Sequence, residues 1–258
     1  MMMKYSFLAS AAIAAIMTSA AFAADMPLKA AAPVALYDWG GIYLGGVVGG
    51  AWGTNDISDP GLTALSPLLG LPTVQSTTSS GFIGGIEGGS RYQFQKLVVG
   101  WEADITWGDL NATNTTSFGA PFIPASRTIT ADSNWLATAT STVGIAHDRW
   151  LVYGKAGVAW ENVNYTDNWT IAGVPLFSGT GSDNRVGWTV GTGVEWAVWQ
   201  NWSIKAEYDY LDFGNRNVAI NGSVPLLGGV GLSSVISDSN HINQFKAGVN
   251  WHILPNFF

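Results

Sequence analysis

The chain has 258 residues, of which only 11% are charged, and its formal net charge is −7. Soluble domains average about 25% charged residues, so this low share, with 32 glycines and 13 tryptophans, argues against an ordinary soluble exported domain. The negative charge disfavours nucleic acid as a partner, and the lack of cysteine excludes disulfides and thiolate metal sites.

The first 23 residues are typical of a secretory signal peptide. Lys4 supplies a positive charge, residues 7–17 form an apolar core, and Ala21-Phe22-Ala23 is an A-x-A cleavage site. We therefore expect the mature chain to begin at Ala24. Beyond this segment no apolar run approaches the roughly 18 residues that a membrane-spanning helix needs.

Apolar and polar residues alternate most clearly at residues 97–107, LVVGWEADITW. In an extended strand Trp101 and Ile105 would lie on one face, and Glu102 and Asp104 on the other. In a soluble sandwich these carboxylates would face water, whereas in a membrane barrel they face a polar lumen and the aromatic face meets lipid. The low charge and the signal peptide favour the membrane barrel.

Segments of this kind recur eight times, and their connections alternate in length. Three connections, around Gln95, His147 and Gln200, are short, whereas the other four span about 20 to 30 residues rich in Ser, Thr, Asn, Gly and Pro. Such alternation is typical of outer-membrane barrels, and an even strand count closes the sheet without an exposed edge. The sequence therefore predicts an all-β fold: an eight-stranded antiparallel up-and-down transmembrane β-barrel with long external loops and short periplasmic turns. The expected strands are residues 39–52, 81–94, 96–107, 133–146, 150–163, 184–198, 202–213 and 241–254.

The polar faces of these strands carry charges of both signs. An eight-stranded barrel is only wide enough for side chains to fill its interior, so these groups are expected to pair within the lumen. Carboxylate pairs such as Glu102 with Asp104, or Glu207 with Asp209, could instead act as acid and base, but the same alternation recurs without a nucleophile beside it. The predicted lumen charge network comprises Glu87, Arg91, Glu102, Asp104, Lys155, Glu161, Glu195, Lys205, Glu207, Asp209 and Lys246.

Aromatic residues gather near both ends of the predicted strands. Rings at two levels are what the two headgroup regions of a membrane select, with a carbohydrate-binding stack as the alternative for the loop end. The ring at the turn end consists of Trp39, Tyr92, Phe94, Trp150, Trp199 and Trp202. The ring at the loop end consists of Trp52, Phe82, Trp107, Trp135, Trp160 and Tyr210.

Signals for catalysis are weak. The three histidines, at 147, 241 and 252, are scattered over both ends of the predicted barrel, so they do not suggest a metal cluster. The sequence carries no nucleophile-elbow, phosphate-loop or dinucleotide motif. His241 with Asp238 and Ser239 is the one outer-rim hydrolase candidate. We therefore expect neither enzyme activity nor a cofactor.

Each of the four long connections contains proline followed by two large apolar residues. One interpretation is that these residues pack on one another as a small cap above the barrel. The other is an exposed apolar patch that meets a partner, lipopolysaccharide or haem. The residues concerned are Leu68, Leu69, Phe122, Ile123, Leu176, Phe177, Leu226 and Leu227.

Several motifs resemble one known family. The run at residues 37–46, YDWGGIYLGG, resembles the first strand of the alphaproteobacterial outer-membrane immunogenic proteins, small porin-family barrels that include Brucella-type surface antigens and haemin-binding relatives. The motifs at 100–104, GWEAD, and at 207–210, EYDY, are similar to later strands of that family. The chain departs from the family in two places: the strand before Val143 lacks an inward Arg, and Pro255 interrupts the C-terminal end.

The resemblance implies a domain order and a location. Residues 1–23 would be the signal peptide, 24–38 a periplasmic Ala/Pro-rich arm, and 39–258 the barrel in the bacterial outer membrane. Its partners would be outer-membrane lipid and lipopolysaccharide, with the barrel-assembly machinery during insertion. The expected function is a surface protein of the cell envelope with a mainly structural or interfacial role. A haem- or other ligand-binding surface protein, or a small-solute porin, is the alternative.

Overall fold

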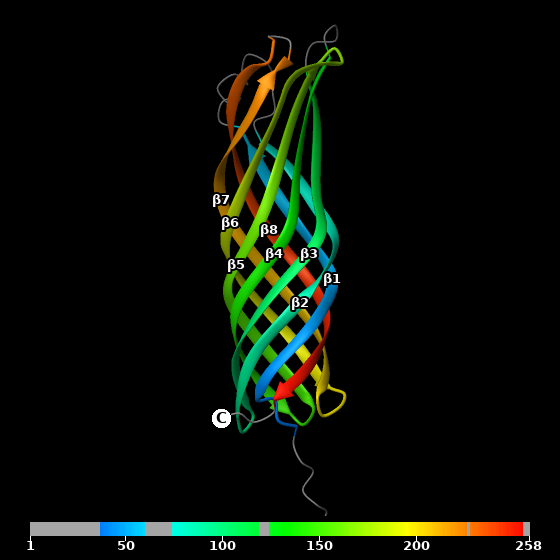
Figure 1. Cartoon of the computed structure of the whole chain (residues 1–258), viewed down its shortest axis with the longest axis vertical. Helices are drawn as coiled ribbons and strands as arrows, with labels where there is room; N and C mark the ends of the chain where they lie inside the picture. The colour runs from blue at the N-terminus through cyan, green and yellow to red at the C-terminus, as the bar shows by residue number, and fades with distance from the viewer. Residues whose placement is uncertain (1–36, 60–73, 119–123, 226–227, 255–258) are drawn as a thin grey trace, which may run out of the picture. The chain divides into compact units, whose positions relative to one another are not determined.

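The computed structural model describes residues 37–59, 74–118, 124–225 and 228–254, and in these residues eight strands form one closed antiparallel barrel (Figure 1). Each strand pairs with the next, and the last pairs with the first, which confirms the predicted fold class. The predicted signal peptide and all but two residues of the predicted periplasmic arm lie outside the described residues. The strands are β1 Gly41–Ser58, β2 Val74–Phe94, β3 Leu97–Phe118, β4 Ala125–His147, β5 Trp150–Ile171, β6 Val174–Ala197, β7 Trp202–Val224 and β8 Val230–Leu254.

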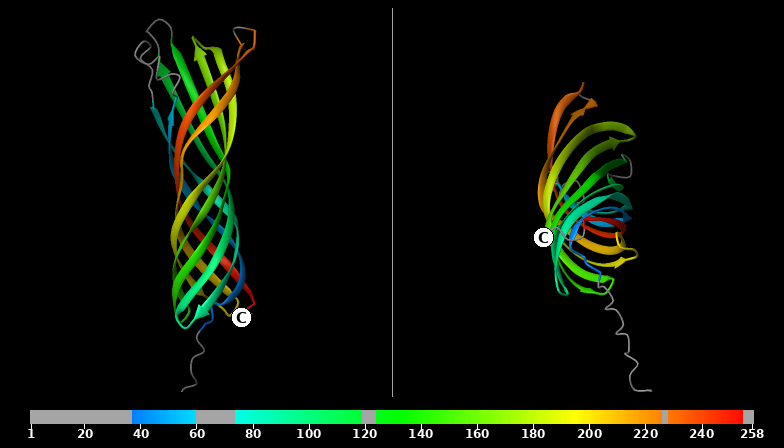
Figure 2. Two further views of the ribbon diagram at one scale, coloured as in Figure 1. Left: turned by 90° about the vertical axis from the view of Figure 1, so that its left-hand side faces the viewer. Right: turned by 60° about the horizontal axis from the view of Figure 1, so that its bottom comes forward.

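The connections predicted to be long are mostly strand. Only Ala172 and Gly173 separate β5 from β6, where a loop of about 20 residues was expected from composition. Both residues have positive φ, 49° and 78°, as a two-residue hairpin turn requires. The three short turns lie at one end of the barrel and the extended strands reach the other (Figures 1 and 2). The prediction of long external loops is therefore corrected to long strands with short links wherever the chain is described.

Burial of alternate residues along each strand separates a lumen face from an outer face, as the period of two predicts. Along β6, Val186, Trp188 and Val190 are exposed on the outside, whereas Thr189 and Glu195 are buried inside. Val98, the one large apolar residue on the polar face of residues 97–107, is 2% exposed and faces inward. It packs in an apolar cluster with Leu151 at the turn end of the barrel, which explains the exception to the alternation.

The outward face changes character partway along the strands. In β3 the exposed residues up to Trp107 are apolar, whereas those after it, from Asp109 to Ser117, are all polar. A tilted strand needs about 9–11 residues to cross a bilayer, and these strands have 18 to 25. A large part of each strand, smallest in β1, therefore continues beyond the lipid, and we call this part of the barrel the extension. The extension begins at the outer aromatic belt, which consists of Trp52, Phe82, Trp107, Trp135, Trp160, Trp188 and Tyr210.

The lumen is filled in layers, which can be followed along the inward residues of β5. Leu151 belongs to an apolar cluster at the turn end, Lys155 to a charged layer, and Ala159 to a second apolar cluster. Above these, Val163 and Tyr165 belong to a third apolar cluster inside the extension. An eight-stranded barrel has room for little else. No helix in the described part of the chain is long and apolar enough to cross a membrane.

Candidate functional site

The charged layer of the lumen is centred on three lysines. Lys205, on β7, is fully buried and contacts three carboxylates. Its Nζ lies 2.6 Å from Glu87, 3.2 Å from Glu102 and 3.1 Å from Glu207. Glu87 and Glu102 come from β2 and β3, on the far side of the barrel from β7, so these contacts cross the lumen.

Lys155, on β5, binds some of the same acids. Its Nζ is 3.0 Å from Glu102, 2.6 Å from Glu207 and 3.4 Å from Asp209. Since the side chains of Lys155, Glu102 and Glu207 are 0% exposed, each ion pair is shielded from water. A buried charge is costly unless it is paired and hydrogen-bonded, and here the pairing is shared among several partners.

Lys246, on β8, completes the layer. Its Nζ lies 3.1 Å from Asp104, 3.1 Å from Glu207 and 2.8 Å from Asp209. Glu207 therefore contacts all three lysines. The structure thus brings together eight of the predicted lumen residues in one closed layer of alternating charge.

Tyr43 ties Arg91 to this layer, as does Tyr153, whose ring centre lies 5.5 Å from the Arg91 guanidinium and whose hydroxyl donates to Glu207 at 2.6 Å. The Arg91 guanidinium lies 4.2 Å from the centre of the Tyr43 ring and 2.7 Å from Glu195. The Tyr43 hydroxyl donates to Glu102 at 2.7 Å. Glycine makes room for the Tyr43 ring, because a Cβ at Gly89 would lie 2.6 Å from the tyrosine oxygen.

The turn end of the lumen is closed by the segment before β1. Trp39 is 0% exposed, and its ring lies 4.8 Å from that of Tyr37 and 5.8 Å from that of His252. Its backbone N–H donates to Gln93 Oε1 at 2.8 Å. Burial, with a smaller contribution from Glu195, raises the pKa of Tyr37 to about 12. Trp39 is thus a plug inside the barrel, which corrects its placement in the aromatic ring that faces lipid.

Inside the barrel, next to this plug, a serine, a histidine and a glutamate lie together. Ser203 Oγ is 2.9 Å from His252 Nε2, and the same Nε2 is 3.6 Å from Glu195. A nucleophilic triad needs the serine and the acid on different ring nitrogens. Because one nitrogen faces both groups and Ser203 is 0% exposed, this cluster is built for packing rather than for attack on a substrate.

A second charged cluster lies higher, in the extension, where Arg185 on β6 is 1% exposed. Its Nη2 is 2.5 Å from Asp238, which also accepts from the Tyr165 hydroxyl at 2.5 Å, and its Nε is 3.5 Å from Asp183. Glu161 belongs to this level rather than to the lysine layer, since it accepts from Asn240 at 2.8 Å. Sequence analysis assigned residue 183 to a loop and left Arg185 and Tyr165 without a role.

A third ion cluster lies near the upper end, and sequence analysis also missed it. Arg127 on β4 is 2.7 Å from Asp167 and 3.2 Å from Asp59, and its guanidinium lies 4.7 Å from the centre of the Trp169 ring. The sequence feature that could have revealed this cluster is the set of alternate residues Arg127, Ile129 and Ala131. They continue the inward face of β4 on the N-terminal side of residue 133, where the strand was predicted to begin.

The outer-rim hydrolase candidate does not assemble. Asp238 faces the lumen and is 0% exposed, whereas Ser239 and His241 face outward. The sheet itself separates the acid from the other two groups. Among the described residues, no three His, Cys, Asp or Glu side chains lie close enough to hold a metal ion.

The predicted apolar loop tips are only partly described. Leu68, Leu69, Phe122, Ile123, Leu226 and Leu227 lie outside the described residues. Leu176 and Phe177 belong to β6 rather than to a loop tip, because the hairpin turn comes earlier, at Ala172 and Gly173. Phe177 is 6% exposed and packs inside the extension with Tyr165 and Ile220.

Comparison with known proteins bears on this arrangement. Residues 9–252 match the family model described as outer membrane protein beta-barrel domain. The 31 kDa outer-membrane immunogenic protein of Brucella melitensis is 33% identical over 227 residues, covering 84% of this chain and 90% of the relative. The 22 kDa outer membrane protein of Rhizobium leguminosarum is 27% identical, covering 76% and 72% respectively.

Among solved structures, the outer membrane protease OmpT of Escherichia coli aligns with a TM-score of 0.48 at 9% identity. The alignment covers 82% of this chain and 96% of OmpT.

Proposed function

The chain belongs to the outer membrane protein β-barrel family, and from this we propose that it is a surface protein of the outer membrane with a mainly structural and interfacial role. The observation that carries the proposal is the continuation of the strands, as a packed and filled barrel, beyond the outer aromatic belt. Such a rigid extension presents a fixed surface outside the lipid. We propose no catalytic activity, because none of the charged clusters offers an accessible nucleophile.

The immediate partners proposed are outer-membrane lipid and lipopolysaccharide. The exposed aromatic residues of the outer belt support this, since such rings favour the headgroup region. The described residues single out no haem site, because His241 faces outward and His252 lies beneath Trp39. Haem binding is therefore not part of the proposal.

The filled lumen disfavours the alternative of a small-solute porin. We expect the unmodified protein to give small conductance or none in planar bilayers, because three lysines and five acids block the lumen. Glu207→Ala should raise the conductance, since it removes the carboxylate that contacts all three lysines. Thr78→Ala, on the outer face, is the control and should change nothing. Large, stable conductance steps from the unmodified protein would contradict the proposal.

Surface exposure of the extension can be tested by labelling, because the chain has no native cysteine. Thr115→Cys places a thiol on the outer face of β3 above the belt, and Lys96→Cys places one in the turn between β2 and β3. A membrane-impermeant maleimide should label the first variant on intact cells, and the second only after the outer membrane is permeabilised. The reverse pattern, or equal labelling of both on intact cells, would overturn the proposed orientation.

A further inference from the structure

The barrel wall is interrupted between β6 and β7, within the extension. The two strands pair at Thr180 with Asn221 and again at Trp188 with Asp212, but residues 181–187 and 213–220 form no β-ladder pairs with each other. One side chain still bridges them, since Arg216 donates to the Val186 carbonyl at 3.4 Å. On their other sides β6 stays paired with β5, and β7 with β8. The gap is therefore an opening closed at both ends.

A bulge in β7 explains the opening. The register of β7 with β8 shifts between Asp212 and Asn215, so Phe213 and Gly214 together lie opposite the single residue Asn240, and β7 has one extra residue there. Gly214 has φ 63°, and its N–H donates to the Asp212 side chain at 2.8 Å. A bulge bends and twists its strand. Here the bend follows directly after the pair of Trp188 with Asp212 and carries β7 away from β6.

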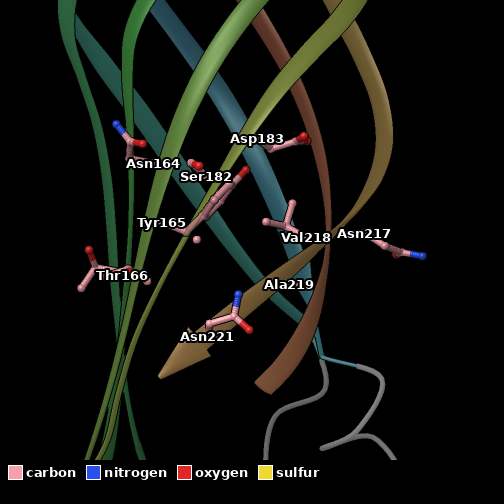
Figure 3. A pocket seen from close by; sticks show the side chains of 11 residues that line it. Asn164, Tyr165, Thr166, Ser182, Asp183, Asn217, Val218, Ala219 and Asn221 are labelled. Carbon is pink, nitrogen blue, oxygen red and sulfur yellow. The ribbon is translucent and has the colours of Figure 1, made fainter. Parts of the chain in front are cut away.

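The opening holds a cavity of about 760 Å³ (Figure 3). Residues from both faces of the sheet line it: Thr180 and Ser182 face outward on β6, whereas Gly181 and Asp183 face inward. Both faces of one strand can border a single cavity only where the wall is parted. The full lining is Asn164, Tyr165, Thr166, Thr180, Gly181, Ser182, Asp183, Asn217, Val218, Ala219 and Asn221.

The cavity is blind rather than a passage into the lumen. Tyr165, at its base, is bound to Asp238, and Val218 packs in the apolar cluster that fills the extension. Arg185 pairs with Asp238 through Nη2 and with Asp183 through Nε, whereas its buried Nη1 has no hydrogen-bond partner. One donor with unused hydrogen-bonding capacity thus lies at the inner side of the opening.

The lining chemistry selects the class of ligand. It offers three amides, three hydroxyls besides the tyrosine, and a single carboxylate, that of Asp183, which is paired with Arg185 at 3.5 Å. Amide and hydroxyl groups both donate and accept, as a ligand rich in hydroxyls requires. No lining residue is a cation. Arg185 behind the lining is already paired with Asp238 and Asp183, and Arg216 beside it donates to the Val186 carbonyl, so neither is free to attract a sulfate or phosphate group. Because both ends of the opening are closed by strand pairing, an extended peptide could not continue along either edge.

We propose that this cavity, the β6–β7 window, binds a neutral sugar unit. The proposal rests on the proposed function in one respect, because it needs the extension to lie outside the membrane. The sugar could belong to the lipopolysaccharide around the barrel or to a soluble glycan, and the two sources share the same hydroxyl chemistry.

Titration with defined sugars tests the window. The protein is refolded without lipopolysaccharide in a detergent that has no sugar headgroup, and binding is followed by saturation-transfer NMR and calorimetry. The probes are maltoheptaose, lipid-free core oligosaccharide and, as a polyanion, dextran sulfate. We expect maltoheptaose or the neutral sugar units of the core oligosaccharide to bind, and the double variant Asn217→Ala, Asn221→Ala to bind the same probe at least tenfold more weakly. Both residues are exposed, so the barrel should still fold.

The control is Asn162→Ala, which removes an amide from the outer face of β5 outside the lining and should leave the affinity unchanged. Binding of core oligosaccharide alone assigns the site to lipopolysaccharide, and binding of maltoheptaose assigns it to soluble glycans. Failure of both maltoheptaose and core oligosaccharide to bind, tighter binding of dextran sulfate, or equal affinity in the double variant would overturn the proposal. The labelling of Thr115→Cys is independent of these results, so failure of the window leaves the proposed orientation separately testable.

Discussion

Lys205→Met is expected to lower the free energy of unfolding by about 3–5 kcal/mol, the usual cost of removing one partner from a buried ion pair. The methionine would fill the space but leave Glu87, Glu102 and Glu207 facing one another without the ammonium group between them. Three carboxylates that surround one site repel each other strongly when water is excluded. Unfolding by guanidinium in lipid vesicles, followed by tryptophan fluorescence, measures the loss.

Two further variants isolate the electrostatic cause. Lys96→Met removes the same charge from an exposed turn and should change the stability by less than about 0.5 kcal/mol. Adding Glu87→Gln to Lys205→Met should recover part of the loss, because one of the three stranded carboxylates becomes neutral. If Lys205→Met is as stable as the unmodified protein, the charged layer does not hold the barrel together.

Val190→Arg should cost more than about 1 kcal/mol and at most about 2–4 kcal/mol, because it places a charge on the lipid face of β6 just inside the outer aromatic belt. Val190 is 45% exposed and lies on the outer face of β6, one residue from the buried Thr189. The loss should appear as a lower midpoint of unfolding in vesicles.

The matched control is Thr78→Arg, on the outer face of β2 above Phe82, where the side chain meets water or headgroups. There we expect a change of about 0–1 kcal/mol, as found close to the membrane interface. Equal costs at the two positions would mean that the lipid band does not lie where the exposed apolar residues place it.

Period-two alternation predicted the membrane-spanning half of the barrel because one face of each strand meets lipid there and the other meets a polar lumen. It failed in the extension, where both faces lose that contrast. In β3, Ala112 and Thr116 face inward while Thr113 and Thr115 face outward, so the polarity scarcely alternates. Here β3 is held by its backbone pairing with β4, for example of Asn114 with Ile129. The apolar side chain of Ile129 helps to fill the interior of the extension.

The alternation along each strand predicts which charged side chains point into the lumen, but it does not predict which of them pair with one another. Arg91 and Glu195 are 104 residues apart in the sequence and meet at 2.7 Å only because the closed, tilted barrel brings their strands together across the lumen. The Trp39 plug was missed because an aromatic residue at a strand end fits a lipid belt equally well. The β6–β7 window depends on the bulge at Gly214, which a search for strands and turns does not register.

The two-residue link between β5 and β6 also limits how such a surface can change during evolution. In an ordinary loop, insertions and deletions are absorbed without altering the rest of the molecule. Here Tyr165 pairs with Gly181, and their ladder continues to the link at Ile171 and Val174 with one bulge, between Trp169 and Thr170. A further residue that is not taken up in such a bulge would exchange the inward and outward side chains of every position that follows on that strand. Variation in this outer part is therefore expected to arise by substitution, by changes at the hairpin itself, or by residues added in pairs.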